Sequence, residues 1–173
     1  MRKASAPTDA VYPQQRFSSQ LPGALLNAFN TNNRINQYLI DCVPLAAWHA
    51  KPPGGRGRSI AAMVSHMHNV RLMWLKVAAK GSDIPPQLDR TTVTPAQALR
   101  ALEQSRYALC ALLSQSLASD GRIKGFRPDV AGFLAYLIAH DAHHRGQIAM
   151  LARQLGHPLP QKAMFGMWEW GTR

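Results

Sequence analysis

Histidine is the residue type best placed to do chemistry in this chain, because five of its seven copies fall in two short stretches. The first stretch, SHMHNVR, contains His66 and His68, and the second, AHDAHHRGQ, contains His140, His143 and His144. On a helix, residues four apart lie about 40° apart around the axis and one turn apart along it. His140 and His144 have this spacing, so their imidazoles could converge on one metal ion.

The direction of each histidine relative to the apolar side of its helix separates candidate ligands from the rest. Counting about 100° per residue, His144 lies within roughly 30° of the centre of the apolar seam, His140 roughly 70° away and His143 roughly 130° away. The same count in the first stretch puts His66 roughly 70° and His68 roughly 130° from the apolar stripe. The sequence therefore predicts that His66, His140 and His144 point inward.

Three inward imidazoles from two helices indicate a site for one divalent metal ion. A single histidine beside an apolar face is usually a hydrogen-bonded core residue, and this stays the alternative for His66 taken alone. The pair His140 and His144 favours a metal, because burying two imidazoles together costs free energy unless a shared cation satisfies both. Neutral nitrogen ligands suit zinc, nickel, iron or copper rather than calcium or magnesium. Three protein ligands leave coordination positions open for water or a substrate, as in catalytic sites.

Asp141 lies between the paired histidines and could have a role of its own. HDAHH differs by one methylene from the HExxH motif of zinc proteases, whose Glu is the general base. An Asp side chain is shorter, and the only downstream Glu that could serve as a third ligand is Glu169. We therefore expect Asp141 to orient a ligand imidazole, or an arginine, from inside the protein rather than to act as a protease base.

Four long helices must position these side chains. The apolar pattern predicts the first helix from Leu21, and Pro44 bends or ends it. Each of the other three follows a residue suited to capping a helix N-terminus, namely Ser59, Thr94 and Asp129. The last helix should stop at Gly156. With no alternating strand pattern, we expect an all-α four-helix bundle that forms a single domain over residues 19–173, after a flexible lead-in at residues 1–18.

The tail of the chain, FGMWEWGTR, contains two of the four tryptophans, Trp168 and Trp170. Tryptophan is a large aromatic residue that proteins bury for most of its surface. We therefore expect this tail to lie against the bundle and to hide both indoles, as core or cavity wall.

The formal charge of +11, from 20 Lys and Arg against 9 Asp and Glu, could attract nucleic acid, an anionic surface or an acidic small molecule. The basic residues are scattered, with no run longer than two and no interleaved aromatic residues, which argues against nucleic acid. No apolar run approaches the roughly 18–20 residues that span a bilayer. The first residues lack the apolar stretch of a signal peptide, so we expect a cytoplasmic protein without membrane attachment.

Around its histidines the chain resembles the DinB-like superfamily, the DinB/YfiT-like bundles. The resemblance runs from about Leu21 to Trp170 and is carried by RSIAAMVSHMHNVRLMWL, HDAHHRGQIAMLARQLGHPLP and the closing WEW. It implies a four-helix bundle, commonly a homodimer, that binds a divalent metal through one His of the second helix and two of the fourth. In this chain those residues are His66, His140 and His144. Members of known activity are metal-dependent thiol transferases and isomerases that use low-molecular-weight thiols.

Four further polar residues near the histidines are candidates for the surroundings of the metal. Arg145 could clamp the carboxylate of a thiol or form an ion pair with Asp141. Asn69 and Arg71 lie about one turn past the first ligand, so they could line the mouth of the same site or make surface contacts. Gln147 completes the HHRGQ motif.

These observations favour a metal-dependent enzyme that acts on a small molecule, either a thiol S-transferase or a hydrolase. The metal, zinc or nickel with iron as a further candidate, would lower the pKa of a bound thiol or water. The excess positive charge would help to draw in an acidic substrate. The alternative is a non-catalytic metal-binding stress-response protein.

Overall fold

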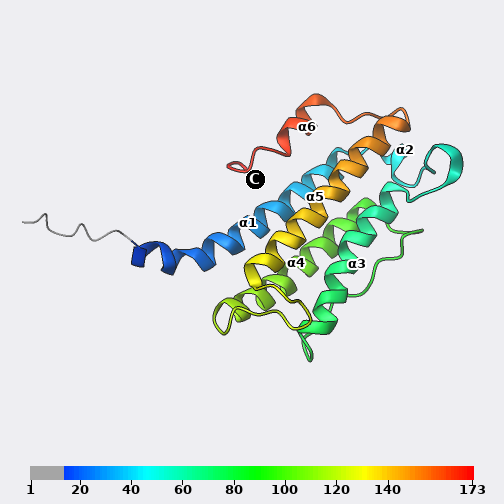
Figure 1. Ribbon diagram of the computed structural model, residues 1–173. Coiled ribbons are helices and arrows are strands. Elements are labelled where there is room, and N and C mark those ends of the chain that lie inside the picture. The colour runs from blue at the N-terminus through cyan, green and yellow to red at the C-terminus, as the bar shows by residue number, and fades with distance from the viewer. Residues whose placement is uncertain (1–13) are drawn as a thin grey trace, which may run out of the picture.

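Four long helices run side by side in the computed structural model, which describes residues 14–173 (Figure 1). They are α1 (Gln14–Cys42), α3 (Ile60–Ala78), α4 (Pro95–Leu117) and α5 (Val130–Gln154). Helices α1 and α3 each pack against both α4 and α5, so α1 and α3 occupy opposite corners of a four-sided bundle. The predicted all-α four-helix bundle is confirmed.

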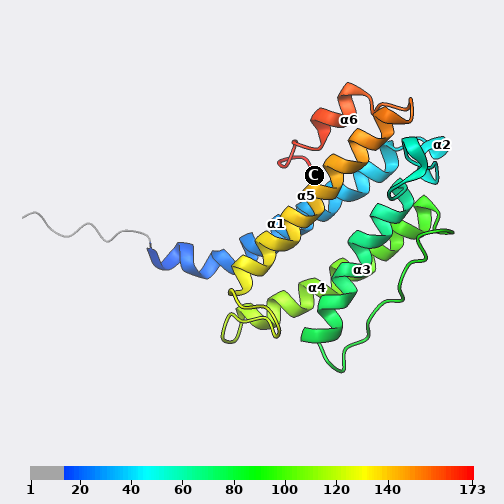
Figure 2. The same ribbon diagram turned by 45° about the vertical axis from the view of Figure 1, so that its right-hand side comes forward.

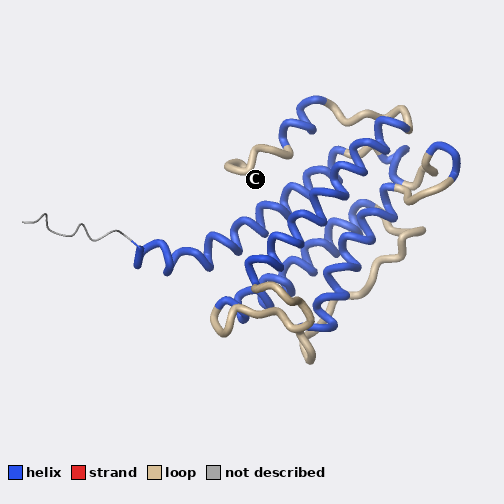
Figure 3. Tube along the Cα trace, in the orientation of Figure 1, coloured by secondary structure: helices blue, strands red, loops and turns tan. Residues whose placement is uncertain are grey.

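Three short helices lie outside the bundle, at α2 (Leu45–Trp48), η1 (Pro53–Gly55) and α6 (Gln161–Gly166). The first two belong to the connection between α1 and α3, and α6 lies on the opposite side of α5 from α3 (Figures 2 and 3). Within residues 14–173 the only β-type pairing is an isolated bridge between Arg122 and Asp129. No helix in this range is both long and apolar enough to cross a membrane.

The three predicted caps, Ser59, Thr94 and Asp129, precede α3, α4 and α5, and they fix where these helices begin. The Ser59 hydroxyl accepts a hydrogen bond from the Ala62 amide, and the Asp129 carboxylate accepts one from the Gly132 amide. Thr94 and Gln97 form a capping box, in which each side chain binds the backbone of the other. These bonds satisfy amides that have no partner inside the helix, and they fix where each helix begins.

The core of the bundle is divided along its axis into two apolar clusters. One is centred on Trp48 and Met67, and the other on Phe29 and Phe133. Between them each long helix contributes buried polar side chains, which we call the polar layer: Asn32, Asn33, Asn36, Arg71, Ser105 and Asp141. Because Asp141 lies between His140 and His144 in α5, this layer sits beside the predicted ligands.

Two features at the ends of the chain differ from the sequence-based expectation. Helix α1 begins at Gln14, so residues 14–18 of the expected lead-in are helical, and residues 1–13 lie outside the described residues. The prediction that the tail hides its tryptophans is wrong, since Trp168 is 80% and Trp170 is 39% exposed. The tail docks instead through buried Ala163 of α6 and through Arg173, whose guanidinium lies 3.7 Å from the centre of the Tyr38 ring.

Candidate metal centre

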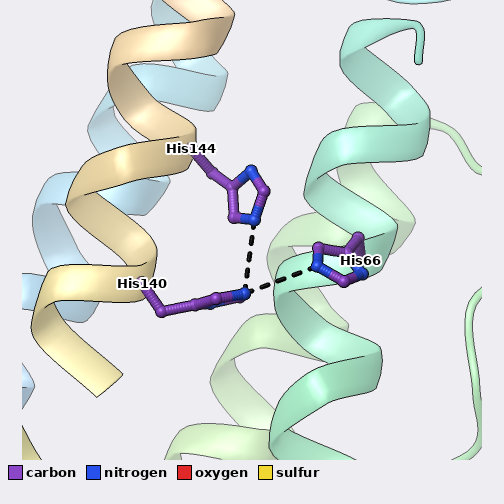
Figure 4. Close-up of side chains that lie close together, drawn as sticks. All are labelled: His66, His140 and His144. Atoms are coloured by element: carbon purple, nitrogen blue, oxygen red, sulfur yellow. Dashed lines mark hydrogen bonds between the residues drawn. The ribbon is translucent and has the colours of Figure 1, made fainter. Parts of the chain in front are cut away.

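Three histidine side chains meet between α3 and α5 (Figure 4). His66 comes from α3, and His140 and His144 come from successive turns of α5. The Nε2 atom of His140 lies 3.4 Å from Nε2 of His66 and 3.2 Å from Nε2 of His144. His144 is buried, whereas the other two are partly exposed, so solvent can reach the cluster. We call these three residues the histidine cluster.

The spacing of the three nitrogens fits a single metal ion. Zinc binds imidazole nitrogen at about 2.0–2.1 Å in tetrahedral geometry, which places two ligand nitrogens about 3.3–3.4 Å apart. The two separations in the structure, 3.2 and 3.4 Å, lie close to this value, and all three ligand nitrogens are within 4.8 Å of one another.

The tautomers of two of the histidines give a second reason to expect a cation. The Nδ1 atom of His144 donates a hydrogen bond to Oε1 of Gln147 at 2.8 Å, which leaves Nε2 of the neutral ring unprotonated. The Nδ1 atom of His140 lies 3.8 Å from Oδ1 of Asp141, and this carboxylate favours a proton on Nδ1. Two nitrogen lone pairs then face each other, and a shared metal ion would remove their repulsion.

The electrostatic surroundings keep His66 and His144 neutral. Burial, followed by the positive charge of Arg58 and the neighbouring rings, lowers the pKa of His66 to about 4. Burial also lowers the pKa of His144, although its hydrogen bond to Gln147 opposes this shift. Only a neutral imidazole can bind a metal, so at neutral pH these two rings are in the ligand form.

Asp141 is held by the polar layer and lies next to the histidine cluster. Its Oδ2 accepts hydrogen bonds from Arg71 Nη2 at 2.8 Å, Asn36 Nδ2 at 2.8 Å and Asn32 Nδ2 at 2.7 Å. Burial alone would raise the pKa of Asp141, but the charge of Arg71 and these hydrogen bonds hold it well below its usual range. The carboxylate is therefore charged and fixed in place.

Asp141 holds an arginine inside the protein, as the sequence predicts, and this arginine is Arg71. The ion pair considered for Arg145 with Asp141 is not present, because Arg145 donates instead to the side-chain oxygens of Asn32 and Asn36 at 2.7 and 2.6 Å. Arg71 is only 1% exposed, so it lies neither at the mouth of the site nor on the surface.

The segment between α3 and α4 accounts for two more differences. The Asn69 side chain makes two hydrogen bonds to the backbone of Leu88. Its Nδ2 donates to the Leu88 carbonyl oxygen at 3.1 Å, and its Oδ1 accepts from the Leu88 amide at 3.0 Å. This contact holds the segment against the flank of α3, where it buries His68, whose Nε2 lies 3.0 Å from the Pro86 carbonyl oxygen. His68 is therefore buried away from the histidine cluster, and His143 is exposed, as its direction predicts.

The asparagines of α1 are the part of the site that sequence reasoning missed. Asn32, Asn33 and Asn36 are at most 1% exposed, although asparagine is a poor helix former that usually stays at the surface. The signal in the sequence was their spacing of three and four residues, on the apolar side of a helix. Asn32 and Asn36 each contact both Asp141 and Arg145.

Aromatic rings cover the side of the histidine cluster that faces the N-terminal end of α5. The ring of Trp74 is the centre of this group. Its centroid lies 5.4–5.8 Å from the ring centroids of Phe126, Phe133 and Tyr136. The Tyr136 ring lies 6.1 Å from that of His140. This end of the cluster is therefore closed by apolar surface.

Comparison with known proteins gives one match. A family model described as the DinB family matches residues 15–170, a segment that contains the histidine cluster and almost all of the four long helices. None of the curated proteins compared with the chain matches it, and no solved structure matches either.

Proposed function

The chain belongs to the DinB family, and on this premise we propose that it is a metal-dependent enzyme for a small molecule, a thiol S-transferase or a hydrolase. The observation that carries the proposal is the meeting of three Nε2 atoms at a spacing suited to one ion. His66, His140 and His144 would hold a divalent transition metal, zinc or nickel first and iron as a further candidate. When bound, such an ion supplies a Lewis acid that lowers the pKa of a thiol or water.

The residues around the histidine cluster have positioning roles in this proposal. Gln147 fixes the tautomer and the ring direction of His144 through its 2.8 Å hydrogen bond. Asp141 favours the matching tautomer of His140 while Arg71 holds the carboxylate still. Side chains fixed in this way need little rearrangement when a ligand arrives, which favours tight and selective binding.

The number of ligands favours an enzyme over a purely structural site. Within the described residues the cluster offers three ligating side chains, whereas structural zinc sites are normally closed by four. Two of the three rings are partly exposed, so a small molecule can approach. The alternative, a non-catalytic metal-binding stress-response protein, would use the same histidines without turnover.

Metal analysis of the purified protein tests the site. We expect about one equivalent of a transition metal in the wild-type protein and almost none in the His144→Ala variant. His143→Ala is the matched control, because this neighbouring histidine is exposed and lies outside the cluster. Equal metal content in both variants would remove the basis of the proposal.

Turnover separates the enzyme from the alternative. The metal-loaded protein should catalyse displacement of halide from an electrophilic aryl halide by a low-molecular-weight thiol, addition of that thiol to an epoxide, or hydrolysis of a small ester or amide. The His144→Ala variant should show neither activity. A protein that holds metal firmly but turns over none of these compounds would favour the non-catalytic role.

The homodimer remains a prediction, and one surface favours it. A groove of about 370 Å³ runs along the face of α5 turned away from the histidine cluster, with Ala142, Gly146 and Ala149 on one side and Trp168 and Trp170 on the other. Exposed indoles beside a helix face made of small residues are typical of contacts between subunits. Sedimentation equilibrium should show a dimer that Trp168→Asp dissociates.

A further inference from the structure

The loop at residues 51–58, KPPGGRGR, carries positive charge, and its Arg58 lies near enough to His66 and His144 for its charge to act on both. It connects α2 to α3 and contains Arg56 and Arg58 on either side of Gly57. Gly57 has φ +109°, a conformation that other residues rarely adopt, so the backbone direction between the two arginines depends on this glycine. The loop geometry is thus specified by the sequence.

A hollow of about 360 Å³ lies between this loop, α3 and α5. Its walls include Arg56 and Arg58 from the loop, Met63 from α3, and Gln147 and Met150 from α5. We call it the cationic hollow. Its wall residue Gln147 is the side chain that binds Nδ1 of His144, so the hollow adjoins His144 through Gln147.

A second hollow, of about 440 Å³, lies on the other side of the loop. Arg58 lines this hollow as well, together with Lys51 and Arg90. Arg58 therefore lines two hollows that both have other basic side chains in their walls.

The positive charge of the loop is not neutralised by the protein. No Asp or Glu lines either hollow, and the sequence has no acidic residue between Asp41 and Asp83. Within residues 14–173 no carboxylate lies within ion-pair distance of Arg56 or Arg58. The charge of Arg58 also reaches the cluster, since it lowers the pKa of both His66 and His144.

We infer that the cationic hollow binds the carboxylate or phosphate group of an anionic substrate or thiol, whose reactive atom then reaches the histidine cluster. This inference rests on the proposed function and names the substrate class of the same site. Guanidinium groups bind such anions with paired, charge-assisted hydrogen bonds. Met63 and Met150 offer apolar surface to the carbon chain between the anionic group and the reactive atom. A neutral molecule would form no ion pair with either arginine.

Two thiols that differ in charge test the inference on the zinc-loaded protein. Mercaptosuccinate carries two carboxylates, and 1-thioglycerol is neutral. By isothermal titration calorimetry we expect the wild-type protein to bind mercaptosuccinate at least about tenfold more tightly, a difference that corresponds to one charge-assisted contact. Arg58→Gln should remove most of this preference and leave the affinity for 1-thioglycerol unchanged within about twofold.

The matched control is Arg100→Gln, because Arg100 is exposed on α4 and lines neither hollow. It lowers the net charge by the same single unit, so general attraction of anions to a basic protein would affect both variants equally. Arg56→Gln provides an independent second variant from the same loop. Thermal melts confirm that each variant is folded before it is titrated.

Zinc content, measured on every sample, separates the possible failures. A wild-type protein that holds zinc but binds both thiols equally overturns this inference alone, as does a preference that survives in Arg58→Gln and Arg56→Gln. A wild-type protein that does not hold zinc overturns the proposed function and this inference with it. Loss of the preference in the loop variants and its retention in Arg100→Gln would support both.

Discussion

The polar layer and the histidine cluster are neighbours in the same bundle, and they satisfy their polar groups in opposite ways. In the polar layer the Asp141 carboxylate has three donors and is 2% exposed. In the histidine cluster, three Nε2 atoms face one another, and two of the three rings are partly exposed. In the first region the protein itself supplies the carboxylate with donors, whereas the second has the acceptors for a cation and, within the described residues, no protein cation among them.

This difference indicates what each region contributes. A buried ion pair such as Arg71–Asp141 resists change, and breaking it costs more than forming it gained. The histidine cluster has no such internal partner, and an ion that binds to it adds free energy to the folded state. The layer therefore positions the ligands, and the cluster provides the chemistry.

The largest effect should follow from breaking the layer. Arg71→Met leaves the Asp141 charge buried without its partner, so we expect the free energy of unfolding to fall by about 3–5 kcal/mol in urea denaturation. The double variant with Arg71→Met and Asp141→Leu has no unpaired buried carboxylate, so it should recover part of the lost free energy of unfolding. A single variant that loses less than about 1 kcal/mol would show that the two regions do not differ in this way.

Adding a metal should stabilise the protein through the cluster alone. Zinc at about a thousand times its dissociation constant should raise the free energy of unfolding by about 4 kcal/mol in the wild-type protein. The His66→Ala variant should show almost none of this rise. Because His66 is partly exposed, its replacement should change the metal-free stability by no more than about 0.5 kcal/mol. An equal rise with zinc in both proteins would place the ion elsewhere.

Removing the link between Gln147 and His144 should have a smaller effect. Gln147→Ala frees the tautomer and the ring of His144, so we expect zinc affinity to fall about 10–100-fold in a competition assay with a chelator. Gln154→Ala, which changes an exposed glutamine in the last turn of the same helix, is the control and should bind zinc normally. Identical affinities would mean that the hydrogen bond does not orient the ligand.

The smallest effect concerns pH. In the unfolded chain histidine titrates near pH 6.5, whereas in the folded protein the pKa of His66 is lowered to about 4 and that of His144 is also lowered. As pH falls below about 6.5 the unfolded chain takes up protons first, so the metal-free protein should lose stability gradually from pH 6.5 toward pH 4.

Thermal melts between pH 7.5 and 4.5 would measure this slope, and His66→Ala should flatten it. Asp141 should not contribute in that range, because its pKa is held well below the usual value and its ion pair persists. A steeper slope in His66→Ala than in the wild-type protein would contradict the assignment.

The sequence predicted the helices that carry the histidines because their signals are local. Ser59, Thr94 and Asp129 each cap a helix with bonds to residues three positions away, and the 100° count needs only the helix itself. The same count brought His66, His140 and His144 to the facing sides of two helices.

What the sequence could not predict depends on which segment covers a helix flank. His68 was placed away from the apolar stripe, yet the segment between α3 and α4 crosses that flank and buries it. Arg71 lies in the core because Asp141, 70 positions along the chain, offers it a charge. Trp168 remains exposed because α6 docks through Ala163 instead. Each outcome depends on contacts between distant parts of the chain, which periodicity alone does not show.

The aromatic rings beside the histidine cluster give the protein an optical probe of its own. Trp74 contacts Tyr136, whose ring in turn lies 6.1 Å from that of His140. An indole this near to a paramagnetic, light-absorbing ion such as Cu²⁺ loses its fluorescence, whereas Zn²⁺ leaves the emission bright. Occupancy can therefore be followed in solution without any label, and a Trp74→Phe variant would show how much of the signal comes from this one ring.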